Sequence, residues 1–151
     1  MNEVKNPAGL PSTLSFRLGT LGSAVADRFA ARIAAYDLKP KHAGLLTALS
    51  LEQVASQQEL ALRLGVAPSL VVALADHLER LGAIERLRDP ADRRRQVLTL
   101  TDRGRELLRD CTTAARTLDE ELTAGLTAAE RGAFLRVLGR LAADAGLPTG
   151  D

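Results

Sequence analysis

The stretch from Asp89 to Gly104, DPADRRRQVLTLTDRG, constrains this chain most, because it places a cationic turn between two short runs of alternating apolar and polar residues. Residues 83–88 and 97–100 alternate as the two strands of a hairpin do. Pro90 fixes its own backbone, and the neighbouring aspartates favour a turn. The sequence therefore predicts a β-hairpin with arginines at its tip.

The positive charge of the chain is concentrated on this hairpin. The segment from Arg80 to Arg105 contains eight arginines and four acidic residues. Its net charge is therefore +4, whereas that of the whole chain is only +1. A narrow arginine-bearing hairpin suits a polyanion, and the backbone and minor groove of DNA are the natural partner. An ordinary solvated hairpin with a charged tip is the alternative at this point.

Upstream of the hairpin, residues 56–82 have the pattern of two helices joined by a tight turn. Ser56-Gln57-Gln58-Glu59 has the form of a capping box, which starts the first helix. Gly65 suits the left-handed residue that ends this helix, and Pro68 suits the first turn of the next. Ala61 is small where the helices cross, and Val71 is an apolar plug between them. A helix-turn-helix followed directly by a wing is the predicted fold.

The rest of the sequence predicts helices. An apolar stripe recurs every three or four residues from Pro11-Ser12 to Tyr36, Pro40 begins a second helix, Thr101 caps a third, and Thr127 opens a capping box for the last. These stripes exceed what a small winged core can cover. We therefore expect the terminal helices of two chains to share one core, with a monomeric helical bundle as the alternative.

Composition narrows the function classes. No run of about eighteen apolar residues suits a membrane span, and the N-terminus lacks a signal pattern, so we expect a cytoplasmic protein that does not enter membranes. Two histidines and one cysteine, Cys111, provide little material for a metal cluster or a nucleophile pair, and there is no Gly-rich phosphate loop. We expect neither an enzyme nor a cofactor, and Cys111 as a buried packing thiol.

At these residues the chain resembles the MarR family of winged-helix transcriptional regulators. The most specific part is the wing pattern D-x-R at Asp92 and Arg94, followed by a strand and L-T-x-x-G at residues 100–104. The resemblance implies a mainly α fold with a small β-wing, in which residues 1–151 form a single domain. In this domain residues 38–100 form the winged helix-turn-helix, and residues 12–36 and 102–146 form dimerisation helices. It also implies a homodimer on a pseudopalindromic operator, usually a repressor, released by a small ligand or an oxidant.

A DNA-binding surface follows from this fold, because the second helix of the motif enters the major groove and the wing reaches the minor groove. Few side chains of that helix offer hydrogen bonds, so its apolar residues are expected to pack on thymine methyl groups, and the wing to provide much of the energy. Asp92 would hold Arg94 in place, and Gln57 would meet a phosphate at a helix N-terminus. The predicted DNA-binding residues are Gln57, Ser69, Leu70, Val72, Ala73, His77, Arg88, Asp92, Arg93, Arg94 and Arg95.

An effector site is implied only by the resemblance. In that family small aromatic or amphipathic molecules bind between the dimer helices and the winged block. The residues expected to line that crevice here are Phe16, Arg17, Leu38, His42, Leu46 and Cys111. Arg17 or His42 would pair with a carboxylate, although all six residues also suit ordinary core and surface positions. A second reading of the whole chain is a winged-helix module that binds another protein through its apolar helix and does not touch DNA.

Overall fold

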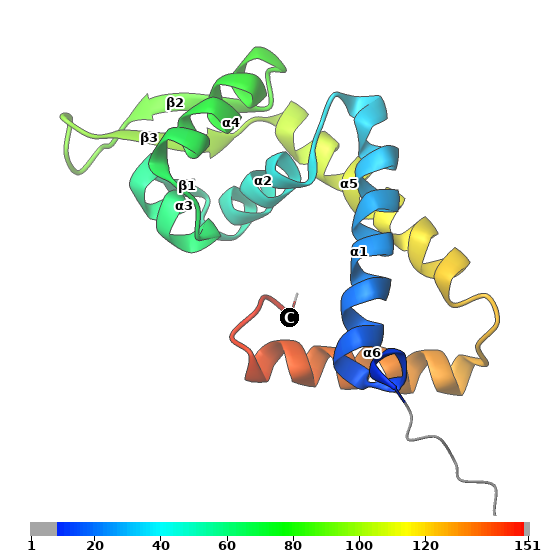
Figure 1. The fold of residues 1–151 in the computed structure, drawn as a ribbon. Helices are drawn as coiled ribbons and strands as arrows, with labels where there is room; N and C mark the ends of the chain where they lie inside the picture. Colours follow the sequence, from blue (N-terminus) through cyan, green and yellow to red (C-terminus); the bar gives the residue numbers. More distant parts are fainter. Residues whose placement is uncertain (1–8, 150–151) are drawn as a thin grey trace, which may run out of the picture. The chain divides into compact units, whose positions relative to one another are not determined.

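The computed structural model describes residues 9–149 (Figure 1). Contacts divide the chain into two separately packed units, one ending at Ala115 and the other beginning at Arg116, within a single helix. The predicted division into a winged block and dimerisation helices follows other boundaries and stays a prediction.

The elements of the first unit are η1 (Leu10–Ser12), α1 (Leu14–Ile33), η2 (Ala34–Tyr36), α2 (Pro40–Glu52), β1 (Val54–Ala55), α3 (Gln57–Leu64), α4 (Pro68–Arg80), β2 (Ile84–Arg88), β3 (Gln96–Leu100) and the first part of α5 (Asp102–Leu122). The second unit holds the end of α5 and α6 (Ala128–Asp144).

The helices begin and end where short-range chemistry directs them. The hydroxyl of Ser56 accepts from the N–H of Glu59, whose carboxylate accepts from the N–H of Ser56, and Thr127 forms the same capping box with Glu130. Gly65 ends α3 in the left-handed region, at φ 63°. These predictions are confirmed. The start of the first helix was wrongly placed, because residues 10–12 form a short 3-10 turn and the side chain of Thr13 caps α1.

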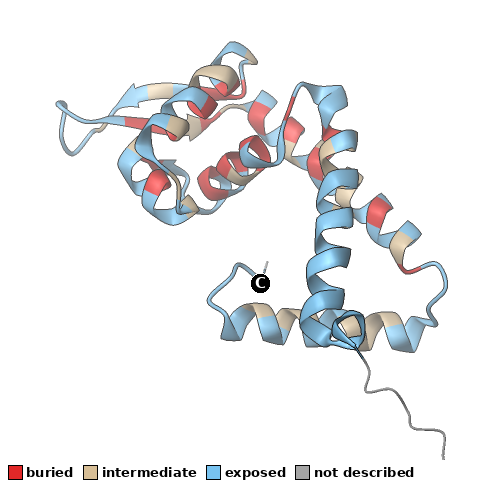
Figure 2. Ribbon diagram, viewed as in Figure 1, coloured by how far each residue is buried: buried red, intermediate tan, exposed pale blue. Residues whose placement is uncertain are grey.

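The winged block, residues 38–100, forms most of one core, to which Ile33 of α1 and Leu107 and Cys111 of α5 also belong. The chain bends by 112° between α3 and α4, as in other helix-turn-helix motifs, and the side chain of Val71 is completely buried at their crossing. Ala61 is also buried there, as expected from its size. The largest buried side chains of the block come from the segment before α2, from α2, α3 and α4, and from the sheet (Figure 2); they are Leu38, Leu45, Leu46, Leu49, Leu60, Leu78, Ile84 and Leu98.

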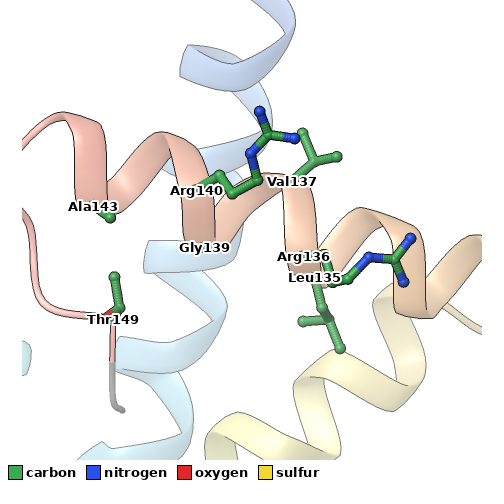
Figure 3. Close-up of a pocket in the computed structure, with 7 residues that line it drawn as sticks. All are labelled: Leu135, Arg136, Val137, Gly139, Arg140, Ala143 and Thr149. Carbon is green, nitrogen blue, oxygen red and sulfur yellow. The ribbon is translucent and has the colours of Figure 1, made fainter.

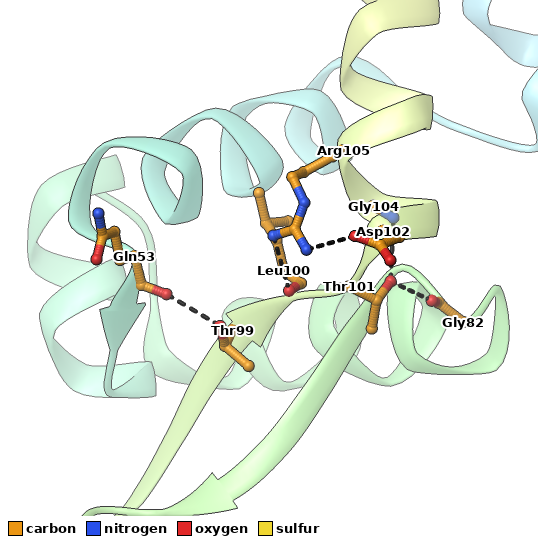
Figure 4. A network of polar contacts seen from close by, with 8 residues as sticks. All are labelled: Gln53, Gly82, Thr99, Leu100, Thr101, Asp102, Gly104 and Arg105. Atoms are coloured by element: carbon orange, nitrogen blue, oxygen red, sulfur yellow. Dashed lines mark hydrogen bonds and ion pairs between the residues drawn. The ribbon is translucent and has the colours of Figure 1, made fainter.

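The hairpin is the predicted one, but it belongs to a three-stranded antiparallel sheet of order β1-β3-β2. Arg88 pairs with Gln96 at its outer end, and Ile84 pairs with Leu100 at its inner end. The two-residue strand β1 was not predicted, because Val54 and Ala55 are strand residues only through their pairing with Thr99 and Leu98. The hydroxyl of Thr99 extends this pairing by donating to the carbonyl of Gln53 at 3.1 Å (Figure 4).

The junction between the sheet and α5 explains the L-T-x-x-G pattern. Thr101 caps α5 through the N–H of Gly104, and its hydroxyl donates to the carbonyl of Gly82 at 2.5 Å (Figure 4). A Cβ on Gly104 would lie 2.0 Å from the carbonyl oxygen of Ala83, much closer than atoms can approach. The glycine is therefore required for packing the start of α5 against the turn that follows α4.

The first half of α1 and the whole of α6 bury far less. The first half of α1 exposes a row of apolar side chains, and α6 has no buried residue (Figure 2). On α6 a hollow of about 620 Å³ is lined by Leu135, Val137 and Ala143, with Arg136 and Arg140 beside them (Figure 3). In residues 9–149 no single helix is long and apolar enough to cross a membrane; only the bent pair α3 and α4 reaches that length and composition together.

Candidate nucleic-acid interface

The tip of the wing is organised by its aspartates. The carboxylate of Asp92 accepts from the backbone N–H of Arg94 at 3.0 Å, and that of Asp89 accepts from the N–H of Ala91 at 2.9 Å. The N–H of Arg95 donates to the carbonyl of Asp92, which closes the turn. Asp92 therefore holds residue 94 through its backbone and does not pair with its guanidinium. This local bonding is how short acidic side chains shape a turn.

The arginines of this turn differ in whether their guanidinium groups form ion pairs within the chain. Arg93 and Arg94 are exposed, and in the part of the chain that the structure describes their guanidinium groups form no ion pair. Arg88, at the end of β2, is exposed as well. Arg95 differs, because its guanidinium pairs with the carboxylate of Glu59 on α3. Within the described hairpin, the arginines available to a polyanion are therefore Arg88, Arg93 and Arg94.

Helix α4 presents two faces. Val71, Leu74, Ala75 and Leu78 are buried against the core. Ser69, Val72 and Ala73 are exposed, while Leu70 is half-buried and packs against the core cluster. The exposed part of its N-terminal half holds one hydroxyl and small apolar groups, while Glu79 and Arg80 are exposed at its C-terminal end.

His77 has partners within the chain. Its Nε2 lies 2.7 Å from the carbonyl oxygen of Asp37, and its ring stacks on that of His42 with centroids 4.4 Å apart. His42 is buried, and its Nδ1 accepts from the N–H of Lys39 at 2.9 Å. Burial, and then the charge of His77, hold the pKa of His42 below its ordinary value. The predicted contact of His77 with DNA stays a prediction, and the contacts of its ring are to Asp37, before α2, and to His42 in the first turn of α2.

A link between α4 and the sheet was missed by sequence reasoning. Arg86 of β2 donates to the carboxylate of Asp76 at 2.5 Å and to that of Glu79 at 2.9 Å, with only 19% of its side chain exposed. Two carboxylates of α4 thus share the single positive charge of one strand residue. The sequence shows the three charged residues but does not show that they meet, because nothing in it aligns β2 with α4.

Gln57 begins α3, beside the wing. Its Oε1 is enclosed and has no hydrogen-bond partner among the described residues. A hollow of about 600 Å³ separates the first turn of α3 from the wing tip, with Gln57, Asp92 and Arg94 among its lining residues. Glu59 and Arg95 also line this hollow, so it holds two carboxylates and two guanidinium groups.

The six residues expected to bind an effector do not come together in one chain. Leu38, Leu46 and Cys111 are parts of the buried core. Phe16 and Arg17 lie in the first turns of α1, about 25 Å along that helix from Ile33. Burial also raises the pKa of the Cys111 thiol, as in a packing residue. Among the described residues no group of three or more histidine, cysteine or acidic side chains could hold a metal ion.

This arrangement is that of a winged helix-turn-helix, with an exposed recognition-helix face and a basic wing on one packed unit. Comparisons with known proteins give the family. The model of the MarR family matches residues 36–95. The chain belongs to the MarR family of transcriptional regulators.

Three relatives illustrate the likeness. A regulatory protein described for the hcr operon of Thauera aromatica is 35% identical over 98 residues, 65% of this chain and 59% of that protein. The chain thus spans about three fifths of the length of that relative. The transcriptional repressor Rv2887 of Mycobacterium tuberculosis is 29% identical over 87% of this chain and 94% of its own. The repressor CouR, solved bound to a 23-mer DNA duplex, is 32% identical, with a TM-score of 0.73 over 88% of this chain and 94% of that one.

Proposed function

We propose that this chain is a sequence-specific regulator, not an enzyme, that binds double-stranded DNA as a homodimer in the cytoplasm and represses transcription until a small molecule releases it. One observation carries the proposal. The guanidinium groups of Arg93 and Arg94 are held at an ordered tip without an ion pair among the described residues, in the same unit as the exposed face of α4. The likeness to a repressor bound to a DNA duplex supports the same reading.

Exposed apolar side chains support the homodimer. Leu14, Leu18 and Leu21 of α1 are 68%, 39% and 42% exposed, and Leu135 and Val137 of α6 are about half exposed. An exposed row of apolar side chains, such as the one on α1, marks an interaction site in soluble proteins. A second copy that covers these helices would place two winged blocks about a two-fold axis, which matches a pseudopalindromic operator.

The effector part of the proposal rests on the family, in which repression relieved by a ligand is typical. Within one chain, Phe16 and Arg17 lie at the far end of α1 from the buried residues near His42. If these six residues form one site, it is completed by the dimer.

Arg94→Ala tests the proposal. Operator fragments are first selected from genomic DNA by the purified chain, and affinity is then measured by band shift over a range of salt. We expect the variant to lose tight binding and to stay folded and dimeric, whereas Arg109→Ala, which removes an exposed arginine from α5, keeps the affinity of the parent chain. Affinity of the parent should fall steeply with salt, because arginines release counterions from phosphates. Equal binding by Arg94→Ala and the parent, or binding to a protein partner insensitive to salt, would contradict the proposal.

A further inference from the structure

The carboxylate of Glu59 serves two partners at once. Its Oε2 accepts from the N–H of Ser56 at 2.9 Å and completes the capping box of α3, while its Oε1 accepts from the guanidinium of Arg95. The capping box already restricts the Glu59 side chain. Only Arg95 must therefore be immobilised to form the ion pair, which lowers the entropy cost that makes most surface pairs weak.

Arg95 lies where the tip of the wing joins β3. Its N–H donates to the carbonyl of Asp92 at 2.9 Å, and its own carbonyl accepts from the N–H of Asp89 at 2.8 Å. Arg94 precedes it directly. The Glu59–Arg95 pair therefore joins the first turn of α3 to the closed end of the arginine turn, across 36 residues of sequence.

We infer that Glu59 is a positioning residue for the wing: through Arg95 it fixes the arginine tip against the start of α3, and so it strengthens DNA binding although its own charge opposes that of DNA. This inference rests on the proposed function. It gives Arg95 a different task from the direct contact with DNA that the sequence predicted. In this account Arg95 orients its neighbours, and Arg93 and Arg94 meet the nucleic acid.

Electrostatics at the pair are consistent with this role. The Ser56 N–H first, and then the Arg95 guanidinium, hold the pKa of Glu59 below its ordinary value. The carboxylate is therefore ionised at every pH at which DNA binding would be measured, and the pair is present there. Both side chains are about half exposed, so the pair acts by orientation and adds little to the stability of the fold.

Glu59→Gln separates the two tasks of the carboxylate. Glutamine also completes a capping box, so α3 keeps its start, but its amide cannot form the ion pair. We expect operator affinity to fall by roughly two- to fivefold with unchanged thermal stability. The matched control is Glu52→Gln, which removes the same charge and breaks the Glu52–Arg63 pair away from the wing. Simple charge repulsion predicts that both variants bind DNA more tightly. Unchanged or tighter binding by Glu59→Gln would overturn the inference.

Arg95→Gln adds an independent readout. If Arg95 positions the wing, this variant weakens binding without changing the slope of log affinity against log salt, and adding Glu59→Gln to it causes no further loss. If Arg95 contacts a phosphate instead, the slope of log affinity against log salt becomes shallower by about 0.9, and the inference fails. Backbone ¹⁵N relaxation of residues 93 and 94 without DNA gives a third test, since Glu59→Gln should lower their order parameters. If no duplex binds the parent chain, the proposed function fails and the relaxation measurement alone decides on the role of Glu59.

Discussion

The winged block and the terminal helices are built from similar residues and bury them very differently. Leu45, Leu46 and Leu78 of the winged block are completely buried within one chain, whereas Leu18 and Leu21 of α1 and Leu141 of α6 are 39–46% exposed. Both kinds of helix carry apolar residues at helical spacing, so the difference is in what covers them. The core of the winged block is completed within one chain, with Ile33 of α1 and Leu107 and Cys111 of α5. The terminal helices have apolar surface that one chain does not cover, which is the expected state of half an interface.

The largest effect should come from breaking the proposed interface. Leu18→Glu combined with Leu21→Glu places two charges on the apolar face of α1. Light scattering should then show a monomer, and operator affinity should fall at least about a hundredfold, because each chain would have to bind its half-site alone. Leu51→Glu makes the same kind of change at a residue of α2 that is 66% exposed, and this control should stay dimeric. A double variant that remains dimeric would show that α1 is not in the interface.

A pair of leucine truncations sharpens the comparison. Leu78→Ala should destabilise the chain by about 2–5 kcal/mol, because it leaves a cavity in a completed core. Its effect on thermal unfolding should not depend on protein concentration. Leu141→Ala should cost little in dilute solution and more as concentration rises, since only association covers that side chain. If both variants showed the same concentration dependence, the contrast between the two regions would be lost.

A glycine substitution tests the junction that joins the winged block to α5. Gly104→Ala forces a Cβ against the carbonyl of Ala83 and should cost about 1–3 kcal/mol in denaturant unfolding. Gly44→Ala is the matched control in α2, where a Cβ would meet only Leu64 at an ordinary 3.8 Å. The control should be stabilised by about 0.5–1 kcal/mol through helix propensity. Equal effects of the two substitutions would refute the close approach at Gly104.

The smallest expected effect concerns pH. His42 has a lowered pKa in the folded chain, so the unfolded chain binds more protons as the pH falls through the ordinary histidine value of 6.5. The winged block should therefore lose stability on acidification below about pH 7, and the loss should be smaller in His42→Gln. Unfolding midpoints measured from pH 8 to pH 5 check the sign. Greater stability of the parent chain at the acidic end would show that the buried imidazole is favoured in its charged form.

Local signals in the sequence predicted most of the fold. The capping boxes at Ser56 and Thr127, the left-handed Gly65 and the hairpin are each determined by residues within a few positions of one another, and the structure has all of them. The strand β1 was not predicted, because its two residues form a strand only through their pairing with β3. The first helix was started too early, since Pro11 also suits the 3-10 turn that precedes Thr13.

The site was less predictable, because its contacts join distant residues. The arginine tip and the exposed face of α4 followed from composition and helical spacing. The pairs Glu59–Arg95 and Arg86–Asp76 and the stack of His42 on His77 depend on how α2, α3, α4 and the sheet pack together. Charge patterns alone do not reveal which cation is neutralised within the chain and which is available to a ligand. Arg95 and Arg94 are neighbours in sequence, yet Arg95 pairs with Glu59 and Arg94 has no ion pair among the described residues.

The mass of the complex between the purified chain and its selected duplex tests the central claim most directly. Light scattering at saturating protein should give two chains on each duplex that carries two half-sites about one helical turn apart, roughly 34–36 Å. A single chain bound at full affinity, or no complex with any genomic fragment, would contradict the account of two winged blocks joined through their terminal helices.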